Sequence, residues 1–144
     1  MTYFRDGSSI YISLEKGDPI NATFEKFSVK KGIRCAWLNG IGAIEDPEIG
    51  YFSSETKSYH RKQFKGEYEL TSLIGNVTMK EGKQFSHTHI TISDTECRVF
   101  GGHLFEAKIV LAGEFIMQLA NREINRKLNA DMGLSIWCLE NCGE

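Results

Sequence analysis

Hydrophobic residues along this chain recur mainly at every second position, which is the spacing of strands packed on one face. The clearest case is residues 9–15, where Ile10, Ile12 and Leu14 alternate with polar side chains. Short runs of similar character follow, separated by glycines that mark turns or close approaches of the backbone. We expect these further strands at 35–39, 48–53, 58–64, 68–77, 84–93, 98–104, 109–119 and 134–139. The run 109–119 also has helical character toward its end, and we favour a strand with an irregular tail.

One segment has helical spacing instead. Three large apolar residues lie three to four positions apart on one face, namely Ile20, Phe24 and Phe27. Asp18 is placed to act as the N-cap, with Pro19 at the first helical position. Gly32 supplies a stop at the other end. This pattern predicts one amphipathic helix over about 18–31.

Taken together, these elements predict an α+β fold, a mostly antiparallel β-sheet with one main covering helix. The chain has 144 residues, of which 41% are hydrophobic and 25% charged, in the ordinary globular range. It contains no repeat, low-complexity tract or proline-rich linker, so we expect one compact domain over residues 1–144. No apolar run approaches the roughly 20 residues of a membrane helix, and the start of the chain does not resemble a signal peptide. We therefore expect a cytoplasmic protein without a membrane partner.

Three of the four histidines lie between positions 87 and 103, and they are the main candidates for chemistry. His87 and His89 belong to the expected strand 84–93. Because side chains of a strand alternate between its two faces, both imidazoles project from the same face, roughly 7 Å apart at the backbone. Two ligands of one metal ion require this spacing.

The third histidine, His103, follows two glycines at the end of the expected strand 98–104. If this strand pairs with the preceding one in a hairpin through residues 94–97, His103 arrives beside the other two imidazoles. Gly101 and Gly102 would let the backbone come close to the site, because glycine lacks side-chain bulk and permits φ angles that other residues avoid.

Three neutral imidazoles are a suitable ligand set for a divalent metal. Zinc, copper, iron and nickel all accept this ligand type, and zinc is the default for a three-histidine set. Three protein ligands leave a fourth position open for water, a small molecule or a group from a neighbouring chain. The alternative is that His-x-His is only the polar face of a strand and that His103 caps a turn.

Several longer blocks are similar to a known family, the plants-and-prokaryotes-conserved (PPC) domain, in its prokaryotic stand-alone branch. The blocks are GEYELTSLIGN at 66–76, HTHITISD at 87–94, VFGGHL at 99–104, LNGIGA at 38–43 and IGYF at 49–52. The resemblance covers nearly the whole chain. It implies a compact α/β fold that assembles as a homotrimer, and a metal site at His87, His89 and His103.

The resemblance also bears on nucleic acids. In plants the domain follows an AT-hook in DNA-associated regulators, and prokaryotic members are often labelled DNA-binding by similarity. This chain has no Arg-Gly-Arg-Pro hook, and its net charge is −2, so a DNA role must rest on a local patch. Arg61, Lys62 and Lys65 lie in the one basic stretch with interleaved aromatic residues. That stretch could follow a phosphate backbone, or it could be a charged edge strand that resists aggregation.

Two further residues are candidates for a pocket near the metal. Glu69 lies in an otherwise apolar strand, where it could be a proton acceptor beside the metal or a glutamate on the solvent face. Asn76 follows Gly75 and could line the same pocket or serve as a turn residue.

The leading functional interpretation is a metal-binding, homotrimeric module with a binding or regulatory role, with association to DNA left open. The alternative is a zinc-dependent enzyme acting on a small molecule. In that case a metal-bound water would be the nucleophile and Glu69 or Glu114 the base.

Overall fold

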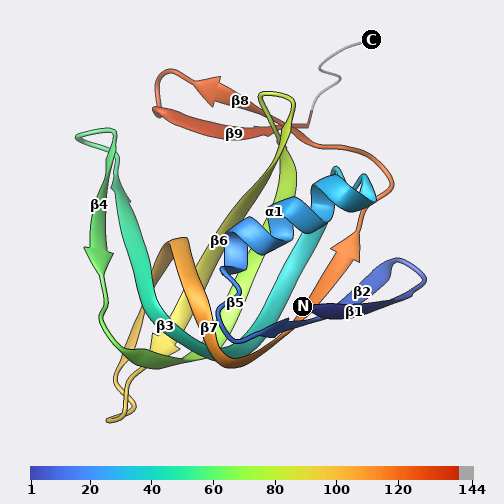
Figure 1. Cartoon of the computed structure of the whole chain (residues 1–144). Helices are drawn as coiled ribbons and strands as arrows, with labels where there is room; N and C mark the ends of the chain where they lie inside the picture. The colour runs from blue at the N-terminus through green and yellow to red at the C-terminus, as the bar shows by residue number, and fades with distance from the viewer. Residues whose placement is uncertain (140–144) are drawn as a thin grey trace.

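Two long strands organise the structure. They are β3 (Ala36–Ser53) and β7 (Val99–Leu119), which pair antiparallel along most of their lengths (Figure 1). The computed structural model describes residues 1–139. The remaining elements are, in chain order, β1 (Thr2–Asp6), β2 (Ser9–Glu15), α1 (Ile20–Lys31), β4 (Ser58–Gln63), β5 (Glu67–Lys80), β6 (Lys83–Ser93), β8 (Asn125–Asn129) and β9 (Leu134–Cys138).

Both long strands change neighbours along their length, and this curls the sheet. The first half of β3 pairs with β5 on one side and with the second half of β7 on the other. The second half of β3 pairs with β4 and with the first half of β7. Because β6 pairs with both β5 and the start of β7, the strands β3, β5, β6 and β7 form a closed circuit. The β1–β2 hairpin extends the other edge of β7.

The helix α1 lies across the curled sheet and covers its core (Figure 1). Its buried face carries Ile20, Phe24 and Phe27, the residues that its sequence pattern predicts. These residues pack in one apolar cluster with side chains of the sheet, among them Leu38, Leu73, Ile92 and Met117. The helix ends at Gly32, which adopts the left-handed conformation with a φ of 65°, as expected for a C-cap glycine.

The N-terminal cap of α1 differs from the prediction. Pro19 occupies the cap position and contributes no side-chain hydrogen bond to the helix, so the N-cap role predicted for Asp18 is wrong. The carboxylate of Glu106 on β7 performs this role instead. Its two oxygens accept hydrogen bonds from the backbone N–H groups of Asn21 and Ala22, both at 3.0 Å. A carboxylate far away in the sequence thus satisfies the first amides of the helix.

Most of the expected strands are confirmed, but several are longer than predicted. The runs at 35–39 and 48–53 are two ends of β3, and those at 98–104 and 109–119 both belong to β7. Judged from the sequence alone, the glycines and the Asp-Pro pair inside β3 suggest that the strand is interrupted. In the structure the pairing register shifts there, so these residues bend a continuous strand. No irregular tail follows within β7.

Two strands escaped the sequence analysis, β1 and β8. All residues of β1 are exposed, and β8 is polar and at most half-buried, so neither shows apolar alternation. The α+β class, with one helix on a mostly antiparallel sheet, is nevertheless confirmed. Among residues 1–139, no helix has the length and apolar character needed to cross a membrane.

Candidate metal centre

The strand β6 holds two of the candidate ligands on one face. His87 and His89 alternate with Thr88 and Ile90, which are buried in the core on the opposite face. The apolar side of β6 is fixed against the helix and the sheet, so the register of the strand is fixed as well. Both imidazoles therefore project away from the core, as their spacing predicts.

His103 on β7 joins them from the neighbouring strand. It lies directly opposite His89 in the antiparallel pairing of β6 with β7, so the predicted hairpin through residues 94–97 is confirmed. A Cβ atom on Gly102 would lie 2.8 Å from the carbonyl oxygen of Gly50, so the backbone approaches closely here, as expected. The φ freedom expected of this Gly-Gly pair is not used, because neither residue has a positive φ.

The three imidazoles form a compact cluster. Their ring centroids lie 5.1 to 5.4 Å apart, and one nitrogen from each ring lies within 4.8 Å of the others. Two nitrogens bound tetrahedrally to one zinc ion at roughly 2.0–2.1 Å lie about 3.4 Å apart, so common coordination requires the rings to approach one another by up to about 1.4 Å. The buried Nδ1 of His103 has no hydrogen-bond partner among the described residues. These observations fit a metal ion as the missing partner.

The surroundings favour neutral rings. Burial, together with Arg126 and the two other histidines, lowers the pKa of His87 to about 4. Burial, His89 and two nearby arginines lower the pKa of His103 to about 4 as well. Burial also lowers the pKa of His89. At neutral pH all three rings carry a lone pair, which is the form that binds a metal.

A buried polar network holds the two ligand-bearing strands in place. Thr88, between the two histidines of β6, donates a hydrogen bond from its hydroxyl to the Oδ1 of Asn21 at 2.7 Å. The Nδ2 of Asn21 in turn donates to the carbonyl oxygens of Leu104 and Phe105, at 3.1 and 3.2 Å, directly after His103. One asparagine of α1 thus ties both strands together at the level of the cluster.

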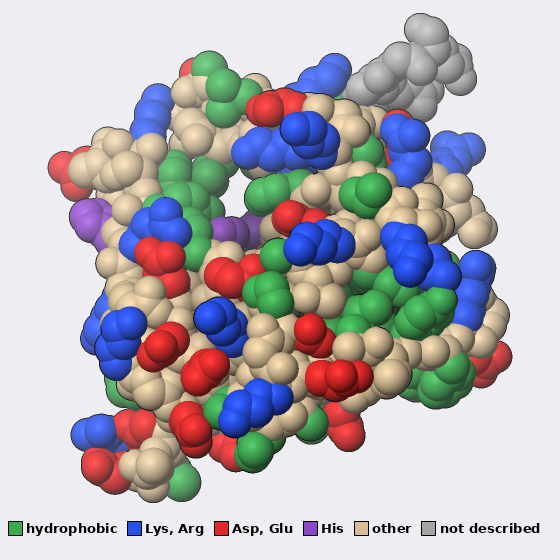
Figure 2. All heavy atoms as spheres, viewed as in Figure 1, with side chains coloured by type: hydrophobic (Ala, Val, Ile, Leu, Met, Phe, Trp, Pro, Cys, Tyr) green, Lys and Arg blue, Asp and Glu red, His purple; other side chains and the backbone are tan. Residues whose placement is uncertain are grey.

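The histidines line a cavity of about 820 Å³. In Figure 2, histidine side chains are visible inside a hollow in the upper part of the view, with hydrophobic side chains along one wall. Aromatic rings lie against the cluster: the centroids of Tyr59 and Phe105 are 4.9 and 5.0 Å from that of His103. The β8–β9 hairpin closes one side with Arg126, Leu134 and Ile136.

Arg126 is the main residue that the sequence analysis missed. Its guanidinium donates to the Oδ1 of Asn76 at 2.9 Å and contacts the Nδ1 of His87 at 3.1 Å. The residue lies in the polar strand β8, nearly forty positions from His87, and no local pattern connects the two. Only the parallel pairing of β8 with β5 brings them together.

The structure separates the other predicted pocket residues. Asn76 is buried opposite His87 in the β5–β6 pairing and accepts a hydrogen bond from Arg126, but it is not among the residues that line the cavity. Glu69 is exposed, pairs with Ser93 further along the sheet, and does not line the cavity. Glu114 is also exposed and lines a different groove. Neither glutamate is therefore placed to act as a base at the histidines.

The basic stretch forms β4, an edge strand that pairs only with β3 among the described strands. Arg61 pairs with Glu48 at 2.8 Å, and its guanidinium lies 3.7 Å from the centroid of the Phe105 ring. Lys62 lies over an aromatic ring at 4.7 Å, and Lys65 lies 4.0 Å from a carboxylate. These partners within the chain favour the edge-strand interpretation, because a cation held by its own chain is less available to a phosphate.

Comparisons with known proteins agree with this architecture. The family model of the Plants and Prokaryotes Conserved (PCC) domain matches residues 1–121. A comparison with curated proteins finds no match.

Among solved structures, a plant- and prokaryote-conserved (PPC) protein of Pyrococcus horikoshii is 38% identical, with a TM-score of 0.84 and coverage of 94% of this chain and 92% of that one. A Bacteroides thetaiotaomicron protein, provisionally described as DNA-binding, is 32% identical, with a TM-score of 0.93 and coverage of 96% and 97%. A metal-containing protein of Archaeoglobus fulgidus is 33% identical, with a TM-score of 0.84 and coverage of 96% and 99%. This chain therefore belongs to the Plants and Prokaryotes Conserved domain family.

Proposed function

We propose that this chain is a metal-binding module with a binding or regulatory role in the cytoplasm. His87, His89 and His103 hold one divalent ion, with zinc as the expected metal. The observation that carries this proposal is the convergence of three neutral imidazoles from two paired strands, with nitrogens within 4.8 Å of one another. The similarity to a metal-containing protein of Archaeoglobus fulgidus supports it.

Elemental analysis of the purified, zinc-loaded protein tests this proposal. We expect about one zinc ion per chain, and a strong loss in the variant His89→Ala, because two imidazoles bind zinc much more weakly than three. His60→Ala is the matched control, since His60 is exposed on β4 and lies outside the cluster. Full zinc retention after replacement of all three histidines by alanine would refute the proposal.

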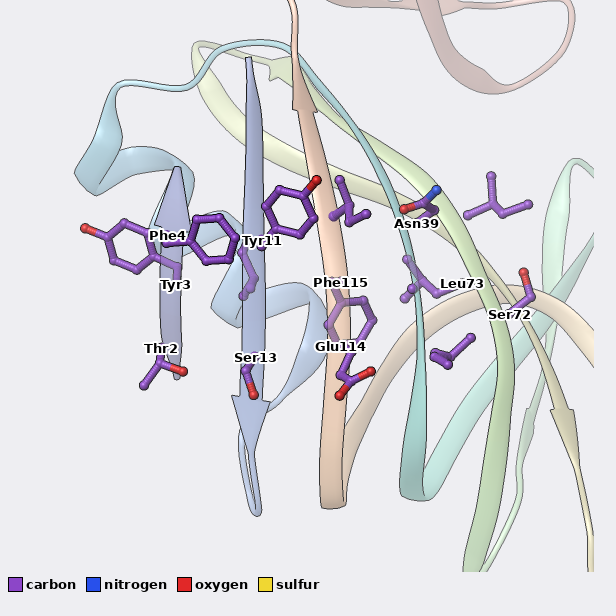
Figure 3. Close-up of a pocket in the computed structure, with 15 residues that line it drawn as sticks. Thr2, Tyr3, Phe4, Tyr11, Ser13, Asn39, Ser72, Leu73, Glu114 and Phe115 are labelled. Carbon is purple, nitrogen blue, oxygen red and sulfur yellow. The ribbon is translucent and has the colours of Figure 1, made fainter. Parts of the chain in front are cut away.

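The proposal includes assembly as a homotrimer, and the outer face of the sheet supports it. One cross-strand row runs from Tyr11 through Ile116, Asn39 and Ile74 to His89. Residues paired across strands share a face of the sheet. The mainly apolar surface that this row forms therefore continues directly to His89. Figure 3 shows its other end, where Phe4 and Tyr11 stack with their centroids 4.7 Å apart.

A partner chain would cover this surface, because patches of this kind on soluble proteins commonly mark interfaces. Light scattering should give a mass near three times 16.3 kDa. Ile41→Lys on the outer face should dissociate the assembly, whereas Val29→Lys on the exposed side of α1 should leave it intact. A monomeric wild-type protein at micromolar concentration would contradict this part of the proposal.

For DNA we propose weak, salt-sensitive contact at most. The similar protein of Bacteroides thetaiotaomicron is provisionally described as DNA-binding, but here the net charge is −2 and Arg61, Lys62 and Lys65 already contact groups of their own chain. Fluorescence anisotropy with duplex DNA at physiological salt should give a dissociation constant in the non-specific range, about 10⁻⁴ to 10⁻⁶ M. Nanomolar, sequence-selective binding would overturn this view.

A further inference from the structure

The side chain of Arg126 has an unusual environment for a cation. Its Nε donates to the hydroxyl of Thr78 at 2.9 Å, and one Nη donates to the carbonyl of Ser135 at 3.0 Å. Its other Nη contacts Asn76 and His87. All of these partners are neutral, and within residues 1–139 no carboxylate pairs with this guanidinium. Arg126 is therefore a half-buried positive charge without a counter-charge, aimed at the histidine cluster.

Metal binding at His87 removes one of these hydrogen bonds. If the Nε2 of His87 binds the metal, the neutral ring carries its proton on Nδ1, which can no longer accept from Arg126. If Nδ1 binds the metal, its lone pair is used by the ion. In both cases an N–H of the guanidinium loses its acceptor at the edge of the metal site, and a donor that is half-buried and has no acceptor destabilises the site.

We propose that the metal-loaded cavity binds a small monocarboxylate with an apolar body, whose carboxylate lies between the open metal position and Arg126. This inference rests on the proposed metal site. A carboxylate supplies both the missing counter-charge and the missing acceptor, and a guanidinium binds it in a favourable planar geometry.

The walls of the cavity define the rest of the ligand. They are mainly apolar and aromatic near the cluster, with Tyr59 and Phe105 beside His103 and Leu134 and Ile136 on the β8–β9 hairpin. Two carboxylates, those of Glu25 and Glu106, lie on the side of the cavity formed by α1 and β7. Their oxygens accept hydrogen bonds from backbone N–H groups. These negative charges disfavour an anion with several charges. A single carboxylate on a hydrocarbon or aromatic body fits both features.

Isothermal titration calorimetry with zinc-loaded protein and benzoate tests the proposal, with benzamide as the neutral analogue and inorganic phosphate as a second anion. We expect benzoate to bind at least about tenfold more tightly than benzamide or phosphate, since charge-assisted hydrogen bonds contribute more than neutral ones. Binding should be lost in the metal-free protein. It should weaken at least about tenfold in Arg126→Gln and by less in Arg126→Lys, which retains the charge.

Lys127→Gln is the matched control, because Lys127 is exposed on the same strand and its removal changes the net charge equally. Zinc content and thermal unfolding are measured for every variant, and Arg126→Lys provides the comparison if Arg126→Gln does not fold. A wild-type protein that takes up no zinc refutes the metal site itself. A zinc-loaded protein that binds benzoate no better than benzamide or phosphate, or equally well without Arg126, refutes the carboxylate proposal alone.

Discussion

The cavity is built by two hairpins that are held very differently. The β6–β7 hairpin carries all three histidines, and β6 pairs along most of its length with β5 and at its end with β7. Its inner face is tied to α1 through Asn21 and Thr88. The β8–β9 hairpin carries Arg126, and β8 joins the rest of the sheet through only two residue pairs, both with β5. It also lies beyond residues 1–121, where the family model matches.

This difference separates two tasks at one site. Metal ligands need fixed positions, because a coordination sphere tolerates little displacement, and a strand bound on both sides supplies them. Arg126, in contrast, lies on a segment with few pairing contacts and is held mainly by its own side-chain hydrogen bonds to Thr78, Asn76 and Ser135. Lightly attached segments are also the ones that open most easily. Under the two proposals above, the strands within residues 1–121 present the histidines, and the β8–β9 hairpin adds the charge that selects the ligand.

The largest effect that tests this comparison is the pH dependence of zinc affinity. Zinc needs neutral imidazoles, and the pKa values of His87 and His103 lie at about 4 instead of 6.5. We therefore expect the zinc affinity to persist to a lower pH than three ordinary imidazoles would allow, and to fall most steeply as the pH approaches 4. Below the lowered pKa values it should fall by up to about a thousandfold per pH unit, because up to three protons compete with the ion. Titration with a competing chelator measures this.

The same titration separates the two hairpins. Burial is the largest cause of the lowered pKa of His87, and Arg126 is the next. Arg126→Gln should therefore shift the fall in affinity to a higher pH, whereas Lys127→Gln should not. Stability of the metal-free protein follows the same sign. Between pH 6.5 and 4, His87 and His103 bind more protons in the unfolded chain than in the folded one. Their contribution to the free energy of unfolding therefore falls as the pH falls through this range, and it is fully present above pH 6.5. An affinity that already declines at pH 7 in the wild type would contradict this account.

The two hairpins also differ in how far the sequence predicts them. The histidines of β6 and β7 are close in sequence and follow the two-residue period of a strand, so local geometry was sufficient to place them together. Arg126 lies in a strand without apolar alternation, and its role depends on a parallel pairing between distant segments. Such non-local pairing cannot be recognised from the composition or from the spacing of hydrophobic residues along the chain.

The same distinction explains the errors at other positions. Glu106 caps α1 from β7, so a search among residues next to the helix could not find it. The Asp-Pro pair in β3 has the local signature of a turn, yet cross-strand pairing continues past it. For Glu69 the sequence left two alternatives open, a pocket residue and a glutamate on the solvent face, and its exposed side chain agrees with the second. For Glu106 and the Asp-Pro pair, a partner distant in sequence decided the outcome.

The smallest effect that we predict concerns the link between the helix and the ligand-bearing strand. Thr88→Val keeps the shape of a buried side chain and removes the hydroxyl that donates to Asn21. The Oδ1 of Asn21 then loses its donor in a buried environment, so the free energy of unfolding of the metal-free protein should fall by about 1–3 kcal/mol. Urea unfolding measures the loss. Thr91→Val is the control, because this side chain is only half-buried and lies outside that network.

Zinc affinity should decrease along with stability in Thr88→Val, because Thr88 lies between His87 and His89 and its hydrogen bond ties this part of β6 to α1. A stability loss without any change in zinc affinity would mean that the network holds the helix and not the ligands. The β6–β7 hairpin would then be rigid through its pairing with β5 and β7 alone. An unchanged stability would mean that Asn21 finds another donor after the substitution. The histidines would in that case need no support from α1, and the contrast between the two hairpins would rest on strand pairing only.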